Sequence, residues 1–303
     1  MTVRMVNGKV FNPEGVEVNA TLQCNMRCRS CAHLSPLFRR ENADPDEVHE
    51  QLSLLAHSYH ASYAKIMGGE PLLHPEILAL IAAVRSSGVA DTILVATNGT
   101  LLHRAPVEFW AAADAVELSL YPSRMPDDDT LQRFRELAVA HEVDLLINHY
   151  DHFRATYSEH ADGSPSVVQD VYDTCKLAHY WHSHTVIDGW FYRCPQSVFM
   201  PRQGVAGGWD PRVDGIELAG DPGFADRLYA FLRRPEPLRA CRNCLGSVGV
   251  RHPHEELDRA NWRPAAGVVD LLDPEFLEVC RADITADDGC VRVSESYPAR
   301  VSR

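Results

Sequence analysis

Three cysteines near the start of the chain have the types and the spacing to hold a metal centre. Cys24, Cys28 and Cys31 fall within eight residues in the pattern C-x3-C-x2-C. Thiolates are ligands for iron–sulfur clusters and for zinc, and either centre ordinarily takes four protein ligands. Three thiolates therefore leave one metal position open to a substrate or co-substrate. The spacing is too tight for one regular element, which predicts a loop wrapped around the metal.

A second group of cysteines lies in the other half of the chain. Its members form a C-x13-G-x4-C pattern followed by a distant C-x2-C: Cys175, Cys194, Cys241 and Cys244. The segment from Thr185 to Cys194 predicts a hairpin that turns at Asp188 and Gly189. Four thiolates from a hairpin and a separate turn can surround a metal. By spacing alone, zinc and an iron–sulfur cluster are both possible.

The first half alternates between segments typical of strands and of helices. Residues 3–10, with Asn7-Gly8 in the middle, predict a hairpin. Further strands are expected near residues 15–20, 64–67, 92–96, 115–121 and 143–148, and helices near 44–60, 74–87 and 127–141. This alternation predicts an α/β domain with a parallel sheet over roughly the first 150–170 residues. Ligands of such folds bind at the carboxyl ends of the strands.

Polar and glycine residues gather at these predicted strand ends. Gly68, Gly69 and Glu70 end one strand, where two glycines allow close approach to a ligand and a carboxylate can accept from an ammonium group. The remaining candidates lie at the ends of the following strands: Thr97, Asn98, Ser119 and Asn148. We therefore expect a binding site on this edge of the sheet.

Charge and composition restrict the class of protein. The chain has 303 residues, with 29 Lys and Arg against 42 Asp and Glu, and a formal charge of −13. This balance disfavours nucleic-acid binding and suits a cationic substrate. No apolar stretch is long enough to cross a bilayer, and no signal peptide is recognisable. Nine cysteines without an export signal predict metal sites in the cytoplasm rather than disulfides.

The C-x3-C-x2-C loop, placed just after a predicted strand, resembles the cluster loop of radical S-adenosylmethionine (SAM) enzymes. The resemblance implies that Cys24, Cys28 and Cys31 hold a 4Fe-4S cluster whose fourth iron is chelated by SAM. One electron then cleaves SAM to a 5'-deoxyadenosyl radical, which abstracts a substrate hydrogen. Gly68-Gly69-Glu70 resembles the family motif that holds the SAM amino group. Thr97-Asn98-Gly99 resembles another strand-end motif, found in the subgroup of the family that carries auxiliary clusters.

The same resemblance implies further SAM contacts. Ser119 and Asn148 match polar positions that touch the ribose and methionine parts of SAM. The residue before the third cysteine is usually bulky and packs on adenine, but here it is Ser30. The adenine contact is therefore expected from one of three other residues: Tyr121, His149 or Tyr150.

The later cysteines resemble the twitch domain, a shortened SPASM domain. This implies a second, auxiliary 4Fe-4S cluster held by Cys175, Cys194, Cys241 and Cys244. The expected architecture is a partial (β/α)6 TIM-like barrel over residues 1–170, followed by a small β-hairpin and helix module over residues 171–303. Residues 291–303 are expected to form a loosely held tail.

Two cysteines stay outside both sets. Cys280 falls on the apolar face of a helix predicted over residues 274–281, where it can be an ordinary packing residue. The alternative is that Cys280 or Cys290 returns a hydrogen atom to a substrate radical, as a thiol does in radical epimerases.

The sequence therefore predicts a radical SAM oxidoreductase or epimerase. The favoured substrate is a small polar natural product, such as the amino sugars and aminocyclitols modified by similar enzymes of antibiotic biosynthesis. A flavodoxin or ferredoxin would supply the electron. The cluster loop starts at residue 24, which leaves no room upstream for a peptide-recognition domain. A peptide-modifying SPASM-type maturase and a non-catalytic zinc-binding module are the alternatives. Substrate identity, the carbon attacked, oligomeric state and the choice between oxidation and epimerisation stay open.

Overall fold

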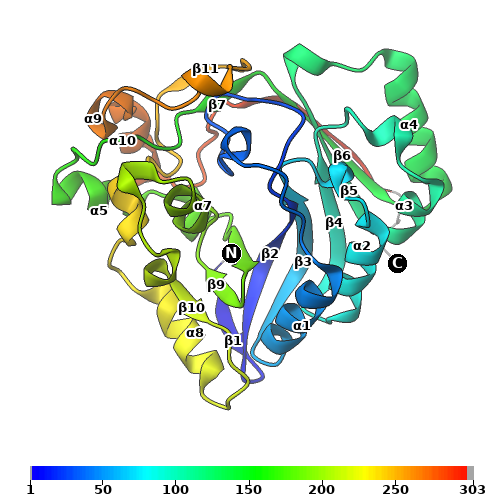
Figure 1. Ribbon diagram of the computed structural model, residues 1–303, viewed down its shortest axis with the longest axis horizontal. Coiled ribbons are helices and arrows are strands. Elements are labelled where there is room, and N and C mark those ends of the chain that lie inside the picture. Colours follow the sequence, from blue (N-terminus) through cyan, green and yellow to red (C-terminus); the bar gives the residue numbers. More distant parts are fainter. Residues whose placement is uncertain (1, 299–303) are drawn as a thin grey trace.

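The apolar, β-branched segments of the first half form parallel strands in the computed structural model, which describes residues 2–298 (Figure 1). Strands and helices alternate in the order β2 (Lys9–Thr21), α1 (Pro45–Ala56), β3 (Tyr59–Gly68), α2 (Ile77–Ser86), β4 (Ala90–Thr97), α3 (Val107–Ala112), β5 (Ala115–Leu120), α4 (Asp128–Ala140) and β6 (Asp144–Tyr150). The predicted alternation is confirmed, and α3 is an addition to it. Helices α1 to α4 lie together on one side of the strands in Figure 1.

The sheet has the strand order β10-β9-β8-β2-β3-β4-β5-β6-β12, and β1 (Arg4–Val6) pairs with β2 as the predicted hairpin. The six central strands, β8, β2, β3, β4, β5 and β6, are parallel to their neighbours within this group. Strands β9 and β10 at one edge and β12 at the other pair antiparallel. The expected α/β fold with a partial TIM-like parallel sheet is confirmed. Its sixth parallel strand, β8 (His184–Ile187), lies beside β2 rather than beyond β6.

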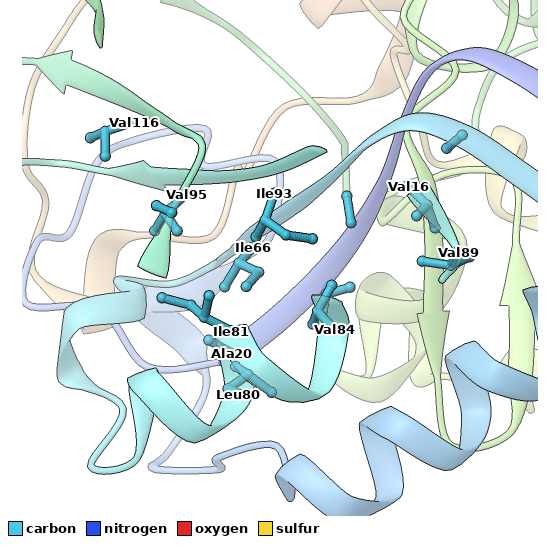
Figure 2. Close-up of a cluster of buried hydrophobic side chains, with 14 of the residues drawn as sticks. Val16, Ala20, Ile66, Leu80, Ile81, Val84, Val89, Ile93, Val95 and Val116 are labelled. Carbon is cyan, nitrogen blue, oxygen red and sulfur yellow. The ribbon is translucent and has the colours of Figure 1, made fainter. Parts of the chain in front are cut away.

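One face of the sheet packs against the helices, and the other lines a cavity. On the helix side, the core includes fully buried side chains of three strands, which form one cluster with Leu80 of α2 (Figure 2). They are Ile66, Val95 and Val116. Successive side chains of a strand point to opposite faces. Lys65, directly before Ile66, therefore faces the cavity side, where it is one of the lining residues.

Local signals place the start of α1 but not its end. Asp44 caps the helix by accepting hydrogen bonds from the Asp46 and Glu47 amides, with Pro45 in the first turn. The helix ends at Ala56, four residues before the predicted end at residue 60. Tyr59 instead begins β3 and is fully buried, because tertiary packing overrides the helical pattern there.

The second half extends the sheet and adds short helices. Its elements are β7 (His152–Arg154), α5 (Pro165–Asp173), α6 (Lys176–His179), β8, β9 (Trp190–Tyr192), α7 (Gln196–Arg202), β10 (Gly215–Glu217), α8 (Phe224–Arg233), β11 (Arg251–Pro253), α9 (Val268–Leu271), α10 (Pro274–Ala282) and β12 (Val291–Tyr297). The hairpin with its turn at residues 188–189 is confirmed by β8 and β9. The predicted domain boundary at residue 170 stays a prediction, and α5 runs across it.

The expectation of a loose C-terminal tail is wrong for most of that segment. Val291–Tyr297 is strand β12, which pairs antiparallel with β6 and covers the edge of the sheet. Arg135 of α4 holds it further through an ion pair with Glu295, at 3.1 Å. The rest of the predicted tail, residues 299–303, lies outside the described residues. No helix of the described part has both the length and the apolar character that crossing a membrane requires.

Candidate active site

A cavity of about 650 Å³ runs along the inner face of the sheet. All three cysteines of the first motif contribute to its lining. So do the strand-end residues Gly68, Gly69, Thr97, Asn98 and Ser119. The second half adds residues from α6 and α7, residues 285–288 before β12, and Cys290. The structure thus brings segments that are far apart in the sequence to one cavity.

The three-cysteine loop holds its thiols close together in a poorly solvated place. Burial raises the pKa of Cys24 to about 12, and the neighbouring Cys31 thiol adds to the effect. Burial also raises the pKa of Cys28, with smaller contributions from Cys31 and Cys24. The Cys24 sulfur accepts hydrogen bonds from the Met26 amide at 3.4 Å and from Asn98 Nδ2 at 3.7 Å. Bound metal would favour the thiolate forms, which this donor set is suited to supply.

A segment of the second half is clamped over this loop. Trp262 Nε1 donates to the Cys28 carbonyl oxygen at 2.9 Å, and the Arg27 amide donates to Glu256 Oε2 at 3.0 Å. His254 Nε2 lies 3.2 Å from the Cys28 sulfur. We call residues 252–262 the strap. Sequence reasoning missed it, because these pairings span more than 220 residues and follow no periodic pattern.

Gly68 and Gly69 are required by close backbone packing. A Cβ on Gly69 would lie 1.8 Å from the Gln23 carbonyl oxygen, and one on Gly68 would lie 2.2 Å from that of Thr21. Gly68 also has a φ of +131°. The strand-end glycines therefore let the end of β3 pack directly against the segment that leads into the cysteine loop.

Glu70 lies behind the cavity wall and is not one of its lining residues. Its Oε1 accepts from Thr97 Oγ1 at 2.7 Å and from the Leu72 amide at 3.1 Å. Its Oε2 accepts from the Asn98 amide at 2.8 Å. Burial raises the pKa of Glu70 to about 7, although these hydrogen bonds oppose the shift. In the structure the carboxylate thus joins the ends of β3 and β4.

The other predicted SAM contacts divide between cavity and edge. Ser119 lines the cavity, whereas Asn148 accepts a 2.7 Å hydrogen bond from Ser294 of β12 and is not a lining residue. Tyr121 and Tyr150 both line the cavity, with their rings stacked at 5.8 Å. His149, the third candidate for the adenine contact, does not line the cavity. It lies beside β12, with its Nε2 3.6 Å from Glu295 Oε1.

The second group of cysteines also comes together. The four members line one small apolar cavity of about 20 Å³: Cys175, Cys194, Cys241 and Cys244. Burial raises the pKa of all four thiols, and for the last three of them neighbouring cysteines of the group add to the effect. The Gly246 amide donates to the Cys244 sulfur at 3.3 Å, as backbone amides commonly do around iron–sulfur clusters.

Neither cysteine group converges on a point. Among residues 2–298, no set of three or more Cys, His, Asp or Glu side chains is arranged to hold a single metal ion. The thiolates of an iron–sulfur cluster ligate different irons, so they surround a volume rather than meet at one atom. Both thiol groups, each lining a cavity, fit that donor arrangement.

The two unassigned cysteines differ in position. Cys290 lines the main cavity, and burial raises the pKa of its thiol to about 12, with a contribution from Asp288. Cys280 is buried in an apolar cluster with Phe276 and Leu277 of α10 and is not a lining residue of the cavity. The geometry therefore separates the two candidate hydrogen donors, because Cys290 lines the cavity and Cys280 does not.

The α/β sheet carries a three-thiol loop at the carboxyl end of its strands and a cavity along its inner face, an arrangement that fits an iron–sulfur centre beside a ligand. Residues 18–138 match the model of the Radical SAM superfamily. This part of the chain is a radical SAM domain, as the cysteine motif predicted.

Similar proteins match less than half of this chain. A GTP 3',8-cyclase of Chlorobaculum tepidum is 36% identical over 121 residues, which cover 39% of this chain and 33% of that protein. A GTP 3',8-cyclase of Heliobacterium modesticaldum is 32% identical over 134 residues, which cover 43% of this chain and 38% of that protein. The match thus spans between a third and two fifths of the length of these relatives.

Two solved structures that the comparison found share little sequence with this chain. BtrN in complex with AdoMet and 2-DOIA has a TM-score of 0.40 at 12% identity, covering 73% of this chain and 82% of BtrN. SuiB of Streptococcus suis bound to S-adenosylmethionine has a TM-score of 0.39 at 14% identity, covering 63% of this chain and 62% of SuiB. The family assignment accordingly rests on the matched domain and the cysteine motif.

Proposed function

We propose that this chain is a radical SAM enzyme that removes hydrogen from a C–H bond of a small polar substrate, with an amino sugar or aminocyclitol as the favoured class. One observation carries the proposal. A single cavity is lined by the three-cysteine loop, by strand-end residues of the radical SAM domain and by residues next to the second cysteine group. Cofactor and substrate would therefore share the main cavity, and the electron acceptor would lie in the adjoining cavity of the four cysteines, with Gln196 and Gly246 lining both.

Each part of the lining has a role in this proposal. When bound, a 4Fe-4S cluster and SAM supply a 5'-deoxyadenosyl radical. Cys24, Cys28 and Cys31 would hold that cluster, and Asn98 donates a hydrogen bond to the first of these sulfurs. Thr97 and Ser119 line the adjoining wall with polar groups, and the stacked tyrosine pair offers an aromatic face for adenine.

The second cysteine group would hold an auxiliary 4Fe-4S cluster. Four thiols around one apolar cavity support full protein ligation, which suits an electron acceptor in an oxidation. Cys290 supports the alternative of epimerisation, because its thiol lines the main cavity, where a substrate radical would form. Flavodoxin or ferredoxin is proposed as the source of the initiating electron.

The charges of the cavity favour an amine over a polyphosphate. Among residues 2–298, its lining has five carboxylates and three cationic side chains: Glu14, Glu17, Glu117, Asp287 and Asp288, against Lys65, Arg154 and Lys176. The cations already have partners in Glu117, Asp273 and the Ala286 carbonyl oxygen, respectively. A nucleoside triphosphate needs several unpaired basic groups. We therefore do not extend to this chain the activity that names its cyclase relatives.

The proposal is tested by anaerobic reconstitution followed by iron, sulfide and zinc analysis. We expect two clusters and, with dithionite and SAM, formation of 5'-deoxyadenosine. Candidate amino sugars with deuterium at single carbons should transfer label into that product. A colourless protein with stoichiometric zinc would refute the proposal in favour of a binding module. Turnover only with a peptide would favour a maturase.

A further inference from the structure

Gln196 is a buried amide without a hydrogen-bond partner. It is the first residue of α7, it is 0% exposed, and neither its Oε1 nor its Nε2 has a partner in the structure. Leaving a buried polar group unpaired is unfavourable, so such a group commonly marks a place for a ligand or water. Gln196 lines both the main cavity and the small cavity of the four cysteines.

The unpaired amide offers one kind of recognition. A carboxamide presents a donor and an acceptor side by side. A hydroxyl group can accept from the NH2 and donate to the oxygen, so it satisfies both atoms at once. An ether or a ketone could satisfy only the donor. Gln196 therefore suits a ligand that carries a hydroxyl.

Glu17 of β2 lines the same cavity and is 8% exposed. Thr185 Oγ1 donates to Glu17 Oε2 at 3.3 Å, and His33 Nε2 lies 3.6 Å from the same oxygen. The ion pairs described for residues 2–298 give Glu17 no Lys or Arg partner. Since both contacts use Oε2, the carboxylate can accept a further hydrogen bond from a cationic ligand.

A chain of contacts connects the carboxylate to the amide. The ring of His33, the neighbour of Glu17, packs against the ring of Phe199 at a centroid distance of 5.6 Å. Phe199 follows Gln196 by three residues on α7, and residues with that spacing lie on one side of a helix. Glu17, His33 and Gln196 all line the main cavity, and Phe199, behind its wall, connects His33 to the helix that carries Gln196.

We infer that Glu17 and Gln196 form a substrate subsite for an amino alcohol, in which the carboxylate binds the ammonium group and the amide binds a hydroxyl. This inference rests on the proposed function and deepens it by naming two recognition groups. Gln196 is also two residues from Cys194. The subsite would accordingly hold the hydroxyl-bearing part of the substrate next to the auxiliary cysteines.

Three small probes test the subsite on the reconstituted holoenzyme with SAM and without reductant. They are trans-2-aminocyclohexanol, cyclohexylamine, which lacks the hydroxyl, and trans-1,2-cyclohexanediol, which lacks the amine. Calorimetric titration should show the amino alcohol binding wild-type protein about tenfold more tightly than either other probe, since each charge-assisted or paired hydrogen bond contributes about one factor of ten.

The variants should then separate the two groups. Met is similar in length to Gln but lacks the amide. Gln196→Met should therefore lower the affinity for the amino alcohol and for the diol about tenfold and leave the affinity for cyclohexylamine unchanged. Glu17→Gln should lower the affinity for the two amines and leave the affinity for the diol unchanged. Gln132→Met, on the exposed face of α4, is the matched control and should change nothing. Iron and sulfide contents equal to those of wild type establish that the clusters are intact.

The inference is overturned if wild-type protein binds the three probes equally, or if Gln196→Met weakens all three alike. If Gln196→Met loses its clusters, the inference is still tested by the titration of Gln196→Glu and by the comparison of the three probes on wild-type protein. Gln196→Glu keeps a hydrogen-bond acceptor but loses the donor. Its loss of affinity for the diol should therefore be smaller than the tenfold loss expected for Gln196→Met. Absence of 5'-deoxyadenosine from reduced wild-type protein would refute the proposed function separately, whatever the probes show.

Discussion

Removing the Glu70 carboxylate should loosen the edge of the sheet that carries the candidate SAM site. Three donors from two segments meet this buried side chain: Thr97 Oγ1 and the amides of Asn98 and Leu72. Each buried donor left without a partner costs about 1–3 kcal/mol. Glu70→Ala should therefore lower the free energy of unfolding by at least about 3 kcal/mol.

The conservative variant should cost less. In Glu70→Gln the amide oxygen can accept from Asn98, and the NH2 can donate to the Thr97 hydroxyl if that group reverses its role. Only the hydrogen bond from the Leu72 amide is then lost, so we expect a decrease of about 1–2 kcal/mol. Glu76→Ala, at an exposed position six residues further on, should change stability by less than about 0.5 kcal/mol.

Urea unfolding of the cluster-free protein under reducing conditions measures these differences without the contribution of bound metal. Affinity for SAM, measured on reconstituted protein, should fall in the same order, because Thr97 and Asn98 are positioned by Glu70. If Glu70→Ala is as stable as Glu76→Ala, the carboxylate does not hold the two strand ends together and the reasoning is wrong.

Three further predictions concern the loop, the glycine motif and the remaining thiol. Trp262→Phe removes the indole donor to the Cys28 carbonyl and should lower the free energy of unfolding by about 1 kcal/mol. The variant should also lose iron to a chelator faster than wild-type protein does. An unchanged rate of iron loss would show that the strap does not hold the loop. Gly69→Ala should abolish SAM binding, measured by calorimetry, because its Cβ would meet the Gln23 carbonyl at 1.8 Å. If the substrate is epimerised, Cys290→Ala should stop solvent deuterium from entering the product while 5'-deoxyadenosine still forms; retained incorporation would exclude this thiol as the donor.

Local signals in the sequence predicted much of the barrel. The turn at Asn7-Gly8, the cap at Asp44 and the strand before Gly68 are each determined by residues a few positions apart, and the structure contains all three. The radical SAM domain was likewise predicted from the spacing of three cysteines. Such features can be read from sequence because their causes are local.

The features that sequence reasoning missed depend on contacts between distant segments. Strand β12 forms because β6 offers an unpaired edge, and the strap forms because the Cys28 backbone lies beside Trp262. The contact expected between Glu70 and SAM stays a prediction, and what the sequence did not show is that the carboxylate accepts hydrogen bonds from Thr97, Asn98 and Leu72. A motif gives the residue type needed at a position, but only the packing gives the direction of the side chain.

The central claim is that Cys24, Cys28 and Cys31 hold a cluster with one iron open to SAM. Its most direct test is electron paramagnetic resonance of the dithionite-reduced, anaerobically reconstituted protein, recorded with and without SAM. A reduced 4Fe-4S signal that changes on addition of SAM, and that is lost in the triple alanine variant of these cysteines while the auxiliary signal persists, is the predicted result. A signal that does not respond to SAM in the wild-type protein would contradict the account.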